Sequence, residues 1–352
     1  MTKRSIALWI TVLLTSASPC LASKIARVEA QKKKTTTVGQ VRMATTPSLR
    51  LIKHHKSEGD VDLVVLNKSG NVAATYFGQD YKTERKVRKL VLWDTSKLSQ
   101  IAEYNITCRD ICFGEDEDTL LIVDSYGIKQ MNIKTGEIKL VLEGEYYKAA
   151  YNPLDNNIIF YSDEIDAYYY NHTTGTSEHL HTVSKGAGVY PFRFYRFTNS
   201  HLQIMMCRNY TLQIDLKDYT TKKVYFSEDS NCRPSLALSP DEDWLLEEGR
   251  FCYYRLYKNA DYMADGERAR PQAEFSTDNI NFETIKYLDG GYLLWGTVNG
   301  RSVEIWDMKT LKMVSSFVHR GKLSYVNSIA HHPEKRLIVV GSLYGVVCFF
   351  KY

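Results

Sequence analysis

The sequence predicts an all-β protein, a β-propeller of seven four-stranded antiparallel blades. A unit of about forty residues recurs along the chain, and each copy consists of apolar, strand-like segments separated by turn residues. Several copies end one such segment on an aromatic residue followed by Asp, most clearly at Trp93-Asp94 and Trp306-Asp307. Four strands per unit with this ending are typical of propeller blades.

Residues 1–22 have the layout of a secretory signal peptide. Lys3 and Arg4 form a charged start, the apolar run Ile6–Leu14 follows, and small residues flank Leu21 where a signal peptidase would act. The run is too short to span a bilayer comfortably, and no later stretch is long enough. We therefore expect a cleaved signal peptide, a secreted or periplasmic protein and no membrane span in the mature chain. An uncleaved membrane anchor is the alternative.

Residues 23–47 are predicted to be a basic, flexible tether. The stretch from Lys24 to Thr37 has no apolar period and carries a net charge of +4. The whole chain also carries +4, so removing this stretch together with Lys3 and Arg4 leaves the remainder at −2. Nucleic-acid binding by the folded body is therefore disfavoured, because that function needs a clustered basic face.

Residues 48–352 are predicted to form a single seven-bladed domain. Turns rich in Pro, Asp, Asn and Gly separate the first two strands of each unit, as at Asn67–Gly70 and Ser239–Glu242. These residue types preset or tolerate turn conformations. Each unit also has an anchor position at the end of its third strand. The predicted anchors are Asp94, Asn132, Asn171, Asp215, Tyr257, Asp307 and Lys351.

These units resemble those of the WD-repeat β-propeller family. The resemblance covers roughly Leu49 to Tyr352 and is strongest in Ser235–Asp241 and Val303–Asp307. The family's Gly-His dipeptide is missing before the first strands, and two anchors, Tyr257 and Lys351, are not acidic. The family's tetrad of Asp, His, Ser/Thr and Trp is therefore incomplete. The resemblance implies a non-catalytic scaffold that binds a protein or peptide.

The last unit ends at Tyr352, directly after its third strand. An open sheet edge at that point would be a template for aggregation. The strand-like segment Ser48–His54 stands before the first complete unit and has no partner there. We expect it to become the fourth strand of the last blade and to close the ring.

The cysteines leave two interpretations open. One of the seven Cys lies in the predicted signal peptide. Cys207, Cys232 and Cys252 fall near one face at the boundary of blades four and five, which permits a disulfide from Cys232 to Cys207 or Cys252; buried free thiols are the alternative. Cys108 and Cys112 lie on one predicted strand, too far apart to bond. No Cys pair has zinc-site spacing, so we expect no metal.

No motif of a known catalytic or cofactor site is present. We therefore expect a protein that is not an enzyme and holds no cofactor. His179 and His181 alternate on one predicted outer strand, which would place both imidazoles on one face. No carboxylate or Cys is expected beside them, so we interpret them as exposed polar residues rather than metal ligands.

Tyr and Arg residues in loops around one face of the ring are the candidate partner-binding residues. These residue types are the most enriched at interaction hot spots; packing along the rim of the ring is the alternative role. The basic segment Gln79–Lys89 is expected either to grip an acidic partner or to be a surface loop. Asn259–Arg270 is an insertion expected to project from the opposite face. The candidates are Tyr81, Tyr126, Tyr147, Tyr190, Arg208, Arg250, Arg301 and Tyr344.

The leading hypothesis is an exported, monomeric, non-enzymatic scaffold that binds a protein or peptide through one loop-rich face. The alternative is an enzyme, or a binder of small molecules or glycans, that uses the central channel, because propellers host many functions. That alternative requires His, Asp and Glu side chains converging on the channel mouth, and none align across the units.

Overall fold

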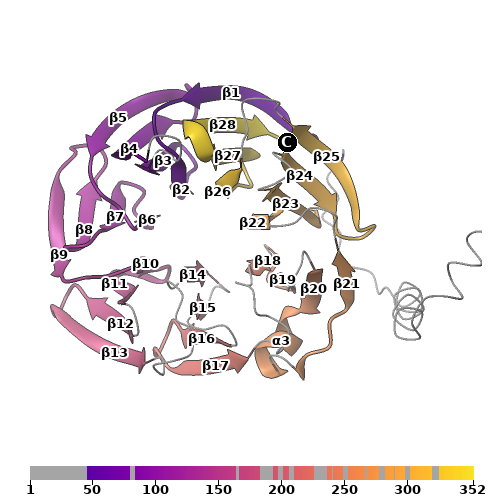
Figure 1. Cartoon of the computed structure of the whole chain (residues 1–352). Helices are drawn as coiled ribbons and strands as arrows, with labels where there is room; N and C mark the ends of the chain where they lie inside the picture. Colours follow the sequence, from indigo (N-terminus) through magenta and orange to yellow (C-terminus); the bar gives the residue numbers. More distant parts are fainter. Residues whose placement is uncertain are drawn as a thin grey trace, which may run out of the picture.

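Seven antiparallel sheets of four strands each surround a central axis (Figure 1). This computed structural model describes residues 46–79, 84–163, 166–182, 193–196, 201–205, 210–225, 236–239, 241–248, 253–265, 268–276, 282–288, 290–297, 302–318 and 325–352. The predicted seven-bladed propeller is confirmed.

Six blades are continuous in sequence, and each runs from an innermost to an outermost strand. Blade one contains β2 (Val61–Leu66), β3 (Val72–Gln79), β4 (Lys86–Asp94) and β5 (Ser99–Asn105). Blade two contains β6 (Asp110–Phe113), β7 (Thr119–Val123), β8 (Gly127–Asn132) and β9 (Ile138–Glu143). Blade three contains β10 (Lys148–Asn152), β11 (Asp155–Ser162), β12 (Asp166–Asn171) and β13 (Thr176–Thr182).

The next three blades follow the same order. Blade four contains β14 (Arg193–Arg196), β15 (His201–Met205), β16 (Tyr210–Asp215) and β17 (Thr221–Tyr225). Blade five contains β18 (Leu236–Leu238), β19 (Trp244–Glu248), β20 (Tyr253–Lys258) and β21 (Ala273–Ser276). Blade six contains β22 (Phe282–Leu288), β23 (Tyr292–Thr297), β24 (Ser302–Asp307) and β25 (Lys312–Val318).

Blade seven joins the two ends of the domain. Its inner strands are β26 (Val326–His332), β27 (Leu337–Ser342) and β28 (Val346–Lys351), and its outermost strand is β1 (Arg50–Lys56). β1 pairs antiparallel with β28, from Arg50 opposite Lys351 to Lys56 opposite Val346. In Figure 1 the first strand of the domain lies along the last one. The predicted closure of the ring is confirmed.

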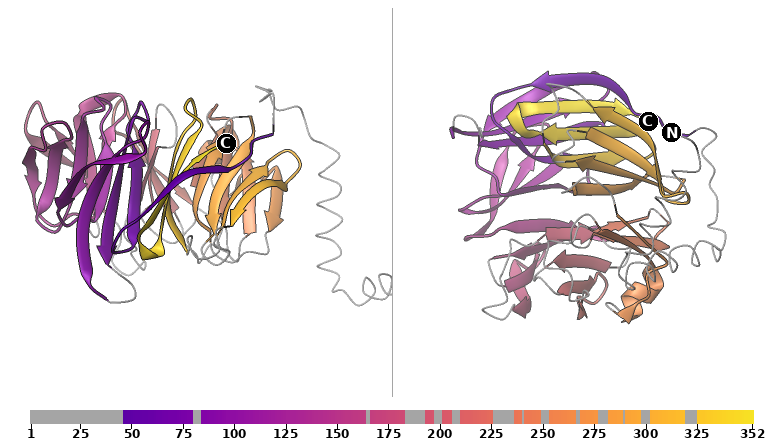
Figure 2. Two further views of the ribbon diagram at one scale, coloured as in Figure 1. Left: turned by 90° about the horizontal axis from the view of Figure 1, so that it is seen from above. Right: turned by 45° about the vertical axis from the view of Figure 1, so that its right-hand side comes forward.

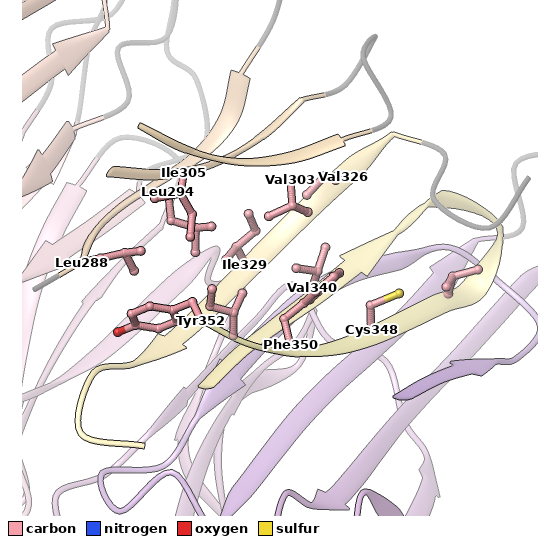
Figure 3. Close-up of a cluster of buried hydrophobic side chains, with 12 residues drawn as sticks. Leu288, Leu294, Val303, Ile305, Val326, Ile329, Val340, Cys348, Phe350 and Tyr352 are labelled. Carbon is pink, nitrogen blue, oxygen red and sulfur yellow. The ribbon is translucent and has the colours of Figure 1, made fainter. Parts of the chain in front are cut away.

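The apolar core lies between neighbouring blades. Figure 3 shows the cluster between blades six and seven, where Leu294 and Val303 face Ile329, Val340 and Phe350. Because both faces of a blade are covered, its middle strands are apolar on both sides; all of β7 and β27 is buried. Each blade therefore depends on two neighbours for the burial of its apolar surface.

Five of the seven predicted anchors end their third strands because their side chains cap the turn to the fourth strand. Asp94 Oδ1 accepts hydrogen bonds from the backbone N–H groups of Ser96 and Lys97, both at 2.9 Å. This is an Asx turn, which Asp and Asn form readily. The same contact to the residue two positions later recurs at Asn132, Asn171, Asp215 and Asp307.

The anchor predicted at Tyr257 is wrong by one residue. Lys258 pairs with Trp244 in blade five as Asp94 pairs with Val72 in blade one. Lys258 therefore holds the anchor position, and its Nζ lies 3.9 Å from the centre of the Trp244 ring. A helical insertion follows at once, so a side-chain cap of the ordinary turn is not needed here.

Tyr257 instead occupies the place that Trp93 has in blade one. Trp93 Nε1 donates a hydrogen bond to Thr75 Oγ1 at 2.8 Å. At the equivalent positions of blade five, the Tyr257 hydroxyl donates to Glu247 Oε2 at 2.9 Å. The Ser/Thr–Trp part of the tetrad is thus present in blade one, and a phenol–carboxyl pair replaces it in blade five.

Blades seven and one are also joined at their turns. His332 Nε2 lies 2.8 Å from the backbone O of Lys68. Gly70 has a φ of +63°, and a Cβ at this position would lie 2.4 Å from the His332 ring, so only glycine fits. On β1, the His55 ring lies 4.7 Å from the ring of Trp93 in blade one. The closing strand therefore contacts both blades.

The insertion after β20 begins with α3 (Asn259–Asp265). It does not project as predicted, because Tyr262 is buried with its ring 5.1 Å from that of Tyr257. Lys222 Nζ, in blade four, donates to the backbone O of Ala264 at 3.4 Å. α3 therefore packs across the outer boundary of blades four and five. No helix within the described ranges has the length and apolarity needed to cross a membrane.

Removing β1 should open the ring. We expect a chain that starts at residue 57 to unfold at a lower temperature than one that starts at residue 46, and to self-associate, because the edge of β28 is left unpaired. Leu51→Ala, which removes part of the contact with the core between blades six and seven, should cost on the order of 2 kcal/mol. Thermal unfolding and size-exclusion chromatography measure both effects; equal stability of the two truncated chains would contradict this account.

Burial raises the pKa of Glu247, and the hydrogen bond from Tyr257 and the charge of Arg255 only partly oppose the shift. Within the described residues, Glu247 Oε1 has no hydrogen-bond partner. In the unfolded chain this carboxyl loses its proton near pH 4.3. Above that pH the unfolded chain releases the proton while the native protein keeps it. The free energy of unfolding therefore falls as the pH rises, until the pH passes the higher pKa of the native state.

Glu247→Gln should therefore stabilise the protein at neutral pH. We expect a melting temperature a few degrees above that of the parent at pH 7.5, and a difference that narrows as the pH falls to 4.5. Glu143→Gln, at an exposed position on β9, is the matched control. A gain that is the same at both pH values would show that ionisation of Glu247 does not weaken the fold.

Candidate functional site

The turns between second and third strands and the connections between blades form one face of the ring, which we call the loop face. The β3–β4 and β27–β28 hairpins both turn at the lower edge of the left-hand view in Figure 2. Tyr126 lies in the β7–β8 turn, Tyr147 lies in the connection from β9 to β10, and Tyr344 lies in the short 3₁₀ turn η3 (Leu343–Gly345). All three belong to this face, as predicted.

Tyr81, Tyr190, Arg208, Arg250 and Arg301 lie outside the described residues. The three cysteines proposed for a disulfide, Cys207, Cys232 and Cys252, lie outside them as well.

Tyr147 is covered by an arginine from the neighbouring blade. The Arg109 guanidinium carbon lies 4.5 Å from the centre of the Tyr147 ring. Arg109 Nη1 donates to the backbone O of Tyr146 at 3.1 Å, and Nη2 donates to Glu145 Oε1 at 2.6 Å. These contacts fix the guanidinium in a partly exposed position at the boundary of blades two and three, so little side-chain freedom remains to be lost on binding.

Tyr126 stands out from the loop face on a rigid turn. Its side chain is 74% exposed. Asp124 Oδ1 accepts hydrogen bonds from the backbone N–H groups of Tyr126 and Gly127, at 2.8 and 3.0 Å. Asp124 Oδ2 forms an ion pair with Lys129 Nζ at 2.5 Å, and Lys129 Nζ lies 5.9 Å from the centre of the Tyr126 ring. A large exposed aromatic ring on a fixed turn is typical of an interaction site.

The two tyrosines belong to one surface. The backbone O of Tyr126 accepts a hydrogen bond from Gly144 at 3.1 Å, three residues before Tyr147. We call Arg109, Tyr126, Lys129 and Tyr147 the blade-two rim. Tyr344 lies elsewhere on the loop face, on blade seven, where its backbone N donates to Asp60 Oδ1 at 2.7 Å.

Sequence reasoning missed the non-tyrosine members of this surface. Arg109 directly precedes β6, and its partners lie in the connection from β9 to β10. Lys129 lies on β8, and its partners Asp124 and Tyr126 lie in the preceding turn. The role of Asp124 had a detectable signal, because Asp163 ends the second strand of the next blade in the same way. Asp163 Oδ1 accepts a hydrogen bond from the backbone N of Asp166 at 2.7 Å, as Asp124 does from Gly127.

A cavity of about 250 Å³ opens beside the blade-two rim, between blades one and two. Two of its lining residues lie on β9: Ile138, which is 38% exposed, and Leu140, which is 55% exposed. The lining residues are Ile106, Thr107, Ile122, Asp124, Lys129, Ile138 and Leu140.

The innermost strands of blades two and three are joined by a largely buried ion pair. Asp110 Oδ1 and Lys148 Nζ are 2.7 Å apart. Burial raises the pKa of Asp110, although Lys148 favours the carboxylate. The pair links β6 to β10 beneath the blade-two rim, and its geometry fits a structural role.

Carboxyl groups also meet at the start of β2. Burial and the charge of Asp60 raise the pKa of Asp62 to about 6. The Asp60 carboxylate is already engaged by the backbone of Tyr344. Among the described residues no group of three or more His, Cys, Asp and Glu side chains is placed to hold a metal ion.

The predicted shared face of His179 and His181 is wrong. A β-bulge places His179 opposite Tyr168 and His181 opposite Ala167. Consecutive residues of β12 point to opposite faces, so the two imidazoles do too. A carboxylate does lie beside one of them, because His179 Nε2 is 3.2 Å from Asp166 Oδ1.

Cys108 and Cys112 are both free thiols, so they do not bond to each other, as expected. They do not share a strand, because β6 begins at Asp110. Burial raises the pKa of Cys112 to about 12, so its reactive thiolate form is scarce at neutral pH.

Comparison with known proteins supports the fold. No family model matches the chain, and no curated protein matches it in sequence. Solved structures do resemble it, 1775 chains in all. Among them is the β-propeller domain of Myceliophteria thermophila Cps50 (Swd1), with a TM-score of 0.64 over 86% of this chain and 99% of that one. The two sequences are 14% identical, so the likeness establishes a shared β-propeller fold.

Proposed function

We propose that this protein is a non-catalytic β-propeller that binds a protein or peptide through its loop face. The observation that carries the proposal is the blade-two rim, where Arg109 is held over Tyr147 beside the exposed ring of Tyr126. Arg and Tyr dominate interaction hot spots. A pre-ordered Arg–Tyr pair loses little conformational entropy when a partner docks.

We further propose that binding takes place outside the cytoplasm. Support comes from the charged start at Lys3 and Arg4, the apolar run Ile6–Leu14 and the small residues around Leu21. The partner would then be a secreted, periplasmic or surface protein. The folded body acts as a monomer, joined to a basic leader that has no recognition role in this proposal.

The alternative is a channel-centred enzyme or a binder of small molecules or glycans. The observation that favours it is Asp62, whose raised pKa of about 6 lies in the range useful for proton transfer. A general base needs a reacting group within hydrogen-bond reach. Its neighbour Asp60 serves the backbone of Tyr344, so the binding role is the better supported.

Two variants test the binding role. The chain from residue 23 onward, immobilised, is used to capture partners from an extract of the source organism, and a captured protein is identified and purified. Arg109→Ala and Tyr126→Ala should each weaken its binding at least about tenfold, a loss of roughly 1.4 kcal/mol in binding free energy, because Arg and Tyr carry much of the energy of such interfaces. Isothermal titration calorimetry gives the dissociation constants.

Lys309→Ala, in an exposed turn on the opposite face, is the control and should leave binding unchanged. If both rim variants bind the partner as tightly as the parent, the blade-two rim is not the binding site. If no partner binds and a small molecule co-purifies with the protein, the channel alternative replaces this proposal.

A further inference from the structure

The cavity between blades one and two has the character of a receptor for one apolar side chain. Ile106 and Ile122 form apolar walls, and Leu140 on the outer strand is more than half exposed at its mouth. A volume of about 250 Å³ is below the range of pockets for drug-sized ligands. Burying a Leu or Phe side chain there would also cover apolar surface that is now in contact with water.

The two charged residues in the cavity do not call for a charged ligand. The Asp124 carboxylate is satisfied by two backbone N–H groups and by Lys129 Nζ. Lys129 is in turn neutralised by Asp124. The interior of the cavity is therefore electrically balanced, which suits an uncharged apolar group.

A basic segment lies directly beside this cavity. β4 and β5 pair as far as Lys89 opposite Asn105. The next residue on one strand is Arg88, and the next on the other is Ile106, which lines the cavity. Arg88 and Lys86 are exposed on the β3–β4 hairpin, with Arg85 farther along it.

The charge of this hairpin is strongly one-sided. Residues 84–89 contain four basic side chains and one acidic one, Glu84. Lys89 is engaged by Ser57 and by Glu103. Arg85 lies 3.7 Å from Glu58, but both side chains are highly exposed, so this pair contributes little. An excess of positive charge therefore faces solvent next to the apolar opening.

We propose that the cavity and the adjacent basic hairpin, together called the cleft, bind an extended acidic peptide segment of a partner protein. One large apolar side chain of the peptide lies in the cavity, and the peptide's carboxylates face Arg88 and Lys86. Tyr126, whose ring centre lies 5.9 Å from Nζ of the cavity-lining Lys129, covers the peptide from the rim. This inference rests on the proposed binding function and specifies the chemistry of the partner. Charge complementarity selects acidic over basic segments.

Selection from a random dodecapeptide library displayed on phage tests the inference, with the chain from residue 23 onward as bait. Enriched peptides should combine a Leu, Ile, Phe or Met with several Asp or Glu residues. Fluorescence polarisation with the synthesised peptides should show at least about tenfold weaker binding to Leu140→Asp. Added salt should weaken binding to the parent, because exposed charges are screened.

Charge reversal provides the sharper test. The double variant Lys86→Glu and Arg88→Glu should lose the acidic peptides and, in a new selection, enrich basic ones that still contain an apolar residue. The matched controls are Met313→Asp, an exposed apolar position on β25, and the pair Lys309→Glu with Lys312→Glu, also exposed. Both controls should select the same peptides as the parent.

Enriched peptides that lack acidic or apolar residues would overturn the inference. Peptides that bind Leu140→Asp and the double variant Lys86→Glu with Arg88→Glu as tightly as they bind the parent would overturn it too. Either result leaves the proposed binding function standing. No enrichment above an unrelated bait protein would overturn it as well. If Leu140→Asp fails to fold, Leu140→Ala takes its place with the same expected direction. Loss of partner binding in Arg109→Ala and Tyr126→Ala, measured separately, decides whether the binding function itself holds.

Discussion

The pairing of β1 with β28 is the interaction on which the rest of the ring depends. Each blade buries its two faces against its neighbours, so an incomplete blade seven would weaken the clusters on both of its sides. β1 supplies the missing outer strand and carries His55 onto Trp93 of blade one. One short segment from the start of the domain thus completes a sheet and ties its neighbour in place.

Within this closed ring, different side chains perform the same geometric task in different blades. Thr75 and Trp93 in blade one correspond to Glu247 and Tyr257 in blade five, each pair joined by a hydrogen bond between the second and third strands. The backbone register is common to both blades. Different side chains can thus form equivalent contacts at the same positions of the fold. This explains how the structure resembles that of another propeller while the two sequences are only 14% identical.

The success of sequence reasoning followed the range of the interactions involved. Anchors such as Asp94 and Asn132 could be predicted because an Asx turn uses a side chain and backbone only two or three residues apart. The anchor predicted at Tyr257 is wrong by one residue because Lys258, which holds the position, cannot form an Asx turn and so leaves no local signal. The contact of Arg109 with Tyr147 and the cavity at Leu140 join segments from different strands and blades. No local pattern encodes such contacts, so the sequence predicted Tyr126 and Tyr147 of the blade-two rim, whereas the contact of Arg109 and the cavity are visible only in the folded ring.

The origin of the closing strand has a consequence for the order of folding. β1 is among the first segments of the domain to be synthesised, yet its partner β28 is the last, since Arg50 lies opposite Lys351. Closing a loop of this length costs on the order of 5 kcal/mol in chain entropy, and contacts so distant in sequence form slowly. β1 therefore stays unpaired until β28 of blade seven has been synthesised. During that interval the growing chain is a six-bladed intermediate with two open ends, which is the stage at which misassembly with another copy is most favoured.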